Sequence, residues 1–144
     1  MSTTLKDLAT IRAGAFFAKG SAEGDAKVSI IRNKNIREGG IASVASLEVV
    51  HLSERNASRS AVSTGDILVA LKGVNPLVAL VPASHAGCVV ANVFAILTPT
   101  DAAAGKRLSD YLASEAGQDA LRGIQRGVAI PAITIVDLAA LVVP

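Results

Sequence analysis

The pattern of apolar and polar positions predicts strands through the first two-thirds of the chain and helices towards both ends. Apolar runs rich in β-branched residues predict strands over 28–33 and 67–71. Residues 45–53 fit either a strand or the passage from a strand into a loop. Residues 75–99 predict two further strands, with a loop of Pro, Ser and Gly between them. The stretch 35–43, which contains paired glycines, is interpreted as a turn.

Two capping-box patterns predict short helices near the two ends of the chain. In such a box, each end residue satisfies a backbone donor of the other. Thr4 and Asp7 form the first, which predicts a short helix or turn that ends at Gly14. Thr134 and Asp137 form the second, which opens a last short helix.

The segment 105–126 has apolar residues at helical spacing and predicts the main helical region. Gly117 is expected to break or kink it, and Gly127 is the expected residue just beyond its C-terminal end. A short apolar strand is then predicted up to Pro131.

The segment 53–66 is interpreted as polar and irregular, ending in a tight turn at 64–66. Strands first and helices at both ends favour an α+β fold with a curled, mostly antiparallel or mixed β-sheet. No linker divides the chain, so residues 1–144 are predicted to form a single compact domain.

Composition narrows the class of protein further. Hydrophobic residues make up 51% of the 144 residues, yet the longest nearly uncharged stretch, 73–100, is interrupted by prolines and cannot form a membrane helix. The N-terminus lacks an apolar signal core, so we expect a cytoplasmic protein. The single cysteine, Cys88, excludes an internal disulfide and is expected to be a buried thiol.

The sequence lacks the motifs of common catalytic and cofactor sites. It has only two histidines, His51 and His85, outside any cluster with metal-ligand spacing. Neither a Gly-x-Ser-x-Gly elbow nor a phosphate loop nor a GxGxxG fingerprint occurs. We therefore expect no cofactor, no metal and no enzymatic activity in this chain by itself, and a small metal-free hydrolase is the weakest alternative.

Four blocks, in this order and spacing, resemble the target recognition domain of a type I restriction–modification specificity subunit. LKDLATIRAG (5–14) is similar to the opening of that domain, and VSIIRNKNIREGGI (28–41) to its next strand and asparagine-containing continuation. STGDILVALKG (63–73) resembles its Gly-Asp-Ile-Leu strand. The segment 88–144 is similar to the closing portion, with a tyrosine-leucine helix, a Gly-x-x-Ile-Pro turn and a last leucine-rich helix.

The resemblance implies a non-catalytic module that recognises double-stranded DNA. In that family, each of two such domains reads one half of a split DNA sequence, an adenine methyltransferase subunit docks on the assembly, and a motor-nuclease subunit cuts. A long spacer helix would begin after Pro144, and we expect a single-domain form that lacks it. Implied partners are DNA, the adenine-specific methyltransferase subunit and the motor-nuclease subunit, with a second copy of this chain as a further candidate.

Candidate DNA-contacting residues follow from the resemblance and from the distribution of charge. The formal net charge is only +2, but the stretch 27–37 contains four bases and no acid. Phosphates are bound by Lys and Arg, whereas Arg and Asn read base edges. On an extended chain Arg32 and Lys34 would share one face. The candidates are Arg32, Asn33, Lys34, Asn35, Arg37, Arg55, Asn56, Arg59, Lys72 and Asn75.

Two other interpretations remain open. Each basic segment fits a solvated strand end or turn without any DNA contact. The low net charge and the 3% aromatic content also fit a stand-alone protein-interaction module that keeps the recognition fold but has lost DNA reading.

Overall fold

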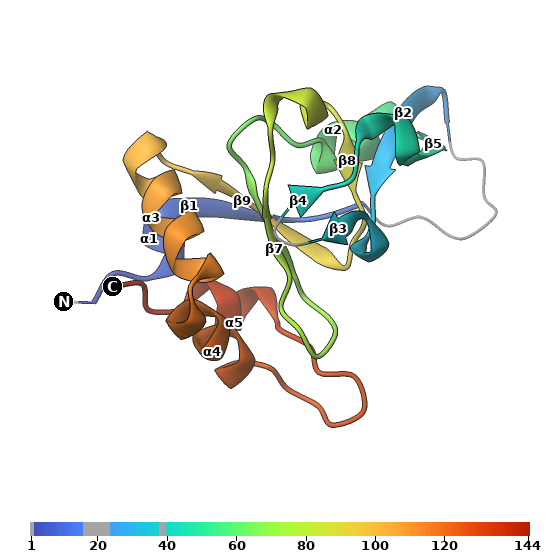
Figure 1. Ribbon diagram of the computed structural model, residues 1–144. Helices are drawn as coiled ribbons and strands as arrows, with labels where there is room; N and C mark the ends of the chain where they lie inside the picture. Colours follow the sequence, from blue (N-terminus) through green and yellow to red (C-terminus); the bar gives the residue numbers. More distant parts are fainter. Residues whose placement is uncertain (1, 16–23, 38–39) are drawn as a thin grey trace.

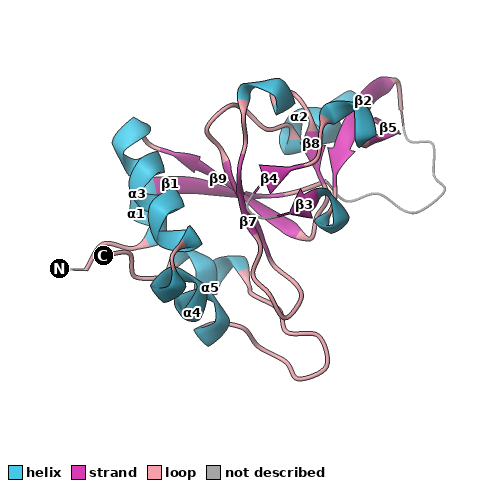
Figure 2. Ribbon diagram, in the orientation of Figure 1, coloured by secondary structure: helices cyan, strands magenta, loops and turns pink. Residues whose placement is uncertain are grey.

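The computed structural model describes residues 2–15, 24–37 and 40–144, and its helices and sheets confirm the predicted α+β class (Figures 1 and 2). The helices are α1 Leu5–Leu8, α2 Glu54–Ser60, α3 Ala102–Ala113, α4 Glu115–Gly123 and α5 Ile135–Ala139, with 3₁₀ turns η1 Asn33–Asn35, η2 Val44–Ser46 and η3 Ala83–His85. The strands are β1 Ala9–Ala13, β2 Ala26–Ile31, β3 Ile36–Arg37, β4 Gly40–Ile41, β5 Glu48–Leu52, β6 Ile67–Ala70, β7 Val78–Leu80, β8 Val89–Val90 and β9 Phe94–Pro99.

Within the described ranges the strands divide among three sheets. The largest has the order β1-β9-β6-β7, and all its neighbours are antiparallel. The second has the order β5-β2-β8, in which β2 runs antiparallel to β5 and parallel to β8. β3 and β4 form a small hairpin. The predicted mostly antiparallel or mixed arrangement is therefore confirmed.

Alternating side chains of the central strands separate the buried residues into distinct clusters. Ile67 and Val69 of β6 face a cluster that includes Leu108 and Leu112 of α3. The next residue along, Leu68, faces a second cluster instead, because successive side chains of a strand point to opposite faces. The helices thus cover one face of the four-stranded sheet, and the second cluster joins its other face to the β2 sheet.

Strand β2 repeats this division in the smaller sheet. Ile31 belongs to the second cluster, with Ile36 and Leu47. Ile30 belongs to a third cluster, beneath α2, with Ala57. Helix α2 and the β3–β4 hairpin therefore pack on opposite faces of β2, which determines where the polar segments of the chain lie.

The N-terminal prediction is half correct. The Thr4–Asp7 capping box is present, since the Asp7 carboxylate accepts a hydrogen bond from the Thr4 backbone N–H at 2.9 Å. The helix does not continue to Gly14, however, because Ala9 is already extended and β1 begins there. β1 pairs with β9 along its whole length, which supplies backbone partners that a longer helix would forgo.

The prediction of an irregular segment after residue 53 is wrong. Ser53 caps α2 by accepting a hydrogen bond from the Asn56 N–H at 3.1 Å. Ala57 buries one side of this polar helix in the third cluster. A cap and a single packed alanine thus form a helix that has little apolar periodicity in its sequence. The tight turn at 64–66 is present, with Gly65 at φ +90°.

Gly117 does not break the C-terminal helical region as predicted. The break lies at Ser114, which ends α3 and whose hydroxyl accepts a hydrogen bond from the Gly117 N–H at 3.1 Å, capping α4. Gly117 is buried inside α4, where the absence of a side chain allows close packing against the end of α3.

The interpretation of the segment before Pro131 also needs correction. Helix α4 ends at Gly123 rather than at Gly127. Gly127 adopts φ +99°, but it does so within an exposed loop, not a strand. Arg126 and Ala132 close this loop through two backbone hydrogen bonds, at 2.7 and 2.8 Å. The predicted last helix is confirmed as α5, capped by the Thr134 hydroxyl.

Candidate nucleic-acid interface

The basic stretch after β2 forms a compact turn, so the predicted extended alternation of its side chains is wrong. Residues 33–35 form η1. Asn35 is buried, and its side-chain oxygen accepts a hydrogen bond from the Arg32 N–H at 2.8 Å. Arg32 is half-buried, and its guanidinium lies 3.0 Å from a Glu48 carboxylate oxygen. These two residues therefore stabilise the turn.

The other members of this stretch are presented to solvent. Asn33, Lys34 and Arg37 are exposed. On the neighbouring strands Lys27 and His51 are exposed register partners of β2 and β5. Alternation from the buried Ile30 and Ile31 places them on the face of the β2 sheet opposite α2. His51 is the member that the sequence prediction did not include.

Helix α2 carries a second polar group. Arg55 and Arg59 are exposed and stand four residues apart, so they share one side of the helix. Asn56 is half-buried. The buried Ser60 hydroxyl donates a hydrogen bond to the Asn56 carbonyl at 2.7 Å, which uses it within the helix.

Arg12 of β1 holds the C-terminal end of α2. Its guanidinium donates hydrogen bonds to the carbonyls of Arg59, at 2.8 Å, and Ala61, at 3.0 Å. A third contact, at 3.5 Å, reaches the Asp66 carboxylate. Sequence reasoning missed this residue because its partners lie far along the chain.

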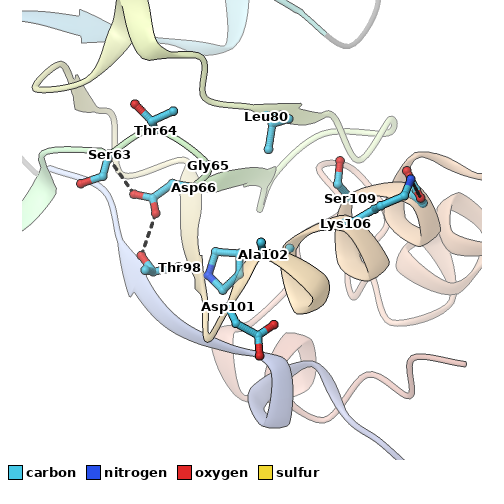
Figure 3. Close-up of a pocket in the computed structure, with 13 residues that line it drawn as sticks. Ser63, Thr64, Gly65, Asp66, Leu80, Thr98, Asp101, Ala102, Lys106 and Ser109 are labelled. Atoms are coloured by element: carbon cyan, nitrogen blue, oxygen red, sulfur yellow. Dashed lines mark hydrogen bonds and ion pairs between the residues drawn. The ribbon is translucent and has the colours of Figure 1, made fainter.

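Asp66 lies at the centre of this buried polar network (Figure 3). Its side chain is buried, and its two carboxylate oxygens accept hydrogen bonds from the Ser63 N–H at 2.9 Å and from the Thr98 hydroxyl at 3.0 Å. The Gly-Asp pair of the STGDIL block is therefore structural, since Gly65 makes the turn and Asp66 ties it to β9 and β1.

Two cavities flank this network. One, of about 610 Å³, lies between β1 and α2 and is lined by Arg12, Ala13, Gly14, Asn56, Ser58, Arg59 and Ser60. The other, of about 580 Å³, lies between the 63–66 turn and α3; its walls include Leu80, Pro99, Ala102 and Lys106 (Figure 3). Cations and amides line the first, whereas the second mixes both charges with small apolar residues.

Lys72 and Asn75 belong to a third group, at the end of the β6–β7 hairpin, and both are exposed. This hairpin end packs beside the loop 126–132, and the two are called the double loop below (Figure 1). The Gly73 N–H donates to the Pro131 carbonyl at 2.9 Å, and the Gln125 amide donates to the Gly73 carbonyl at 2.8 Å.

The double loop has an apolar tip. Val128 is fully exposed, Ile130 is 70% exposed and Val74 is 69% exposed. Arg126 forms an ion pair with Asp137 at 2.8 Å, and this hydrogen bond holds the pKa of the Asp137 carboxyl below its ordinary value. Such an apolar cluster on a fixed loop marks an interaction surface of some kind.

The predicted residues therefore do not form one surface. The turn at 33–37 and helix α2 lie on opposite faces of the β2 sheet, and the double loop belongs to the helical side of the four-stranded sheet. Asn35 and Arg32 are engaged in holding the turn. Asn33, Lys34, Arg37, Arg55, Arg59, Lys72 and Asn75 are exposed.

Other candidate chemistry is accounted for within the described ranges. No group of three or more His, Cys, Asp or Glu residues there is placed to hold a metal ion. Cys88 is buried, as predicted, and burial raises the pKa of its thiol. The buried His85 lies 2.8 Å from the Ala42 carbonyl and bridges two loops. Over the same ranges, none of the helices has the length and apolar character needed to cross a membrane.

This arrangement of mixed sheets, helical flank and exposed polar turns is the fold of the specificity subunits of type I restriction–modification systems. The S subunit from M. genitalium matches 99% of this chain with a TM-score of 0.60 and 18% identity. The HsdS subunit from Thermoanaerobacter tengcongensis matches 100% with a TM-score of 0.69 and 17% identity. A chain from a type I R-M complex matches 100% with a TM-score of 0.70 and 18% identity.

The match concerns one part of each of those proteins. This chain spans 33%, 32% and 37% of their respective lengths. No protein-family model matches the sequence, and no curated protein matches it either. The resemblance to a target recognition domain that the four sequence blocks indicated is thus confirmed at the level of the fold.

Proposed function

We propose that this chain is a sequence-specific recognition module for double-stranded DNA, which directs a type I adenine methyltransferase and its motor-nuclease partner to one half-site. The observation that supports this most is the match of the whole chain to about one-third of each S subunit. The module has no catalytic role of its own, and methylation and cleavage belong to partner subunits.

The exposed side chains supply the chemistry that such reading needs. Lys34, Arg37 and Lys72 present cations that neutralise phosphates and release counterions. Asn33 and Asn75 present amides, which bind adenine in a bidentate manner in the major groove. We assign Asn35 and Arg32 a supporting role, because they fix the turn on which Asn33 and Lys34 stand.

Selection from random duplexes tests this function directly. The chain is incubated with a random duplex library in low and physiological salt, and bound DNA is sequenced. Enrichment of one short sequence, with binding that weakens as salt rises, is the expected result. Absence of both a preferred sequence and salt-sensitive binding would overturn the proposal.

Replacement of both Lys34 and Arg37 by alanine is expected to weaken binding to all sequences alike. Each lost phosphate contact lowers the slope of log Kobs against log[salt] by about 0.9. A fluorescence-anisotropy titration over several salt concentrations measures the slope. Lys6→Ala, an exposed lysine on α1, is the matched control and should leave the slope unchanged; an equal change in both proteins would argue against the turn.

The apolar tip of the double loop favours a second candidate function, a protein-interaction module. Three exposed apolar side chains are poorly suited to a phosphate backbone but suit a protein surface. We infer that the methyltransferase subunit is the protein that this tip contacts, in addition to or instead of DNA reading by the rest of the chain.

The double variant Val128→Asp and Ile130→Asp is therefore expected to reduce capture of the adenine methyltransferase subunit encoded nearest to this gene by at least tenfold, because burying two unpaired carboxylates is costly. A pull-down with purified subunit measures it, and DNA binding should be retained. Leu80→Asp, at a half-exposed leucine outside the double loop, is the control. Undiminished capture by the double variant would exclude this tip as the contact.

A further inference from the structure

The cavity between β1 and α2 brings two cations together without a carboxylate. Arg12 and Arg59 line it with Asn56, Ser58 and Ser60, and its lining includes no acid. Its side chains offer mostly hydrogen-bond donors and positive charge. A tetrahedral phosphoryl group, with several acceptor oxygens and negative charge, is the ligand chemistry that matches such a lining.

Arg12 is held in place before any ligand arrives. Its guanidinium is tied to two carbonyls and to Asp66, and its side chain is only 34% exposed. These three contacts use three of its five N–H donors. Little side-chain entropy remains to be lost on binding, so a further contact from the remaining donors is favoured.

The same bonds remove a repulsion that would otherwise exclude an anion. Helix α2 ends at Ser60, and the carbonyls at a helix C-terminus carry partial negative charge. Arg12 donates to the carbonyls of Arg59 and Ala61 and thereby neutralises this end of the helix. The exposed Arg59 side chain then contributes a positive charge that the described ion pairs do not offset.

We propose that this cavity, the β1–α2 cavity, binds a phosphoryl group, with Arg12 as the fixed donor and Arg59 as the mobile cation. A backbone phosphodiester of bound DNA and a free phosphate or nucleotide phosphate share this chemistry. At about 610 Å³ the cavity exceeds one phosphate, so it also has room for the adjoining sugar. The phosphodiester assignment rests on the proposed DNA-binding function, whereas the phosphoryl site itself does not.

The first experiment is independent of DNA. Inorganic phosphate is titrated into the ¹⁵N-labelled chain, and the arginine Nε–Hε signals are followed by NMR. The signals of Arg12 and Arg59 are expected to shift together and to saturate. Arg122, an exposed arginine on α4 that pairs with Asp119 at 3.3 Å, is the internal reference and should not shift.

The second experiment identifies the source of the phosphoryl group. Arg59→Ala is expected to lower the salt slope of DNA binding by about 0.9, whereas Arg122→Ala leaves it unchanged although both remove one positive charge. Thermal unfolding confirms that Arg59→Ala remains folded, which we expect because only the main chain of Arg59 accepts the bond from Arg12.

The outcomes separate the site from the function. Phosphate shifts together with a reduced slope assign a DNA phosphodiester. Phosphate shifts with an unchanged slope, or with no DNA binding by the wild-type chain, keep the site and assign a free phosphoryl ligand; the latter result also rejects the proposed DNA reading. A reduced slope without phosphate shifts supports a site specific for the phosphodiester. No shift and an unchanged slope overturn the proposal.

Discussion

Gly117→Ala is expected to lower the free energy of unfolding by about 3 kcal/mol, at the upper end of the cost of overpacking a core. A Cβ atom at this position would overlap the Tyr111 carbonyl oxygen and would lie 2.9 Å from Leu112 Cα. Both are backbone atoms of α3, so no flexible side chain can move aside. Helix α4 must shift, and Leu121, which it buries in the core beside Leu112, must shift with it.

Gly123→Ala is the matched control for this prediction. Gly123 is in the same helix, and a Cβ atom there meets nothing within 4 Å. Alanine should stabilise that position by about 0.5–1 kcal/mol, because glycine has low helix propensity. Denaturant unfolding followed by circular dichroism measures both variants. If Gly117→Ala were as stable as wild type, the close α3–α4 contact would be wrong.

The elements that the sequence predicts well are those whose signal is local. Strands β2 and β6 follow from β-branched runs, and α5 from the Thr134 cap. Helix α2 could not be predicted in this way, because its stability depends on Ala57 packing beneath the β2 sheet. β1 is similar, since β9, some 85 residues later in the chain, pairs with it.

The candidate site illustrates the same division at the level of single residues. The sequence identifies a basic, asparagine-containing stretch, but Asn33 and Asn35 are equivalent in composition. Only the folded turn distinguishes them, because Asn35 is buried and bonds to the Arg32 backbone while Asn33 is exposed. Likewise, nothing local relates Arg12 to Arg59, although they line one cavity.

The position of Ile30 and Ile31 explains why the candidates separate into groups. These neighbours face opposite sides of β2, so the segments that pack over them lie on opposite faces. A duplex that contacts both the 33–37 turn and α2 must therefore approach the edge of this sheet rather than either face. The salt slopes of the Lys34/Arg37 and Arg59 variants, measured separately and together, test whether one duplex reaches both.

Asp66→Ala is expected to destabilise the fold by about 2–4 kcal/mol. The buried carboxylate accepts hydrogen bonds from the Ser63 N–H and the Thr98 hydroxyl, and its removal leaves both without this acceptor. It also removes the partner of Arg12. Breaking a buried pair costs about 3–5 kcal/mol, and the figure is reduced here because Arg12 is 34% exposed and solvent partly screens its charge.

Asp110→Ala is the control for this effect, because Asp110 makes only an exposed pair with Lys106 and should change stability by less than about 0.5 kcal/mol. Asp66→Asn separates shape from charge: it keeps an oxygen acceptor but loses the attraction to Arg12, and its stability should fall between wild type and Asp66→Ala. Denaturant unfolding ranks the four proteins. Equal stability of the Asp66→Ala and Asp110→Ala variants would show that the network does not hold the turn. If the ranking holds, Asp66→Asn should also weaken phosphate binding in the β1–α2 cavity, because Arg12 is then less firmly fixed.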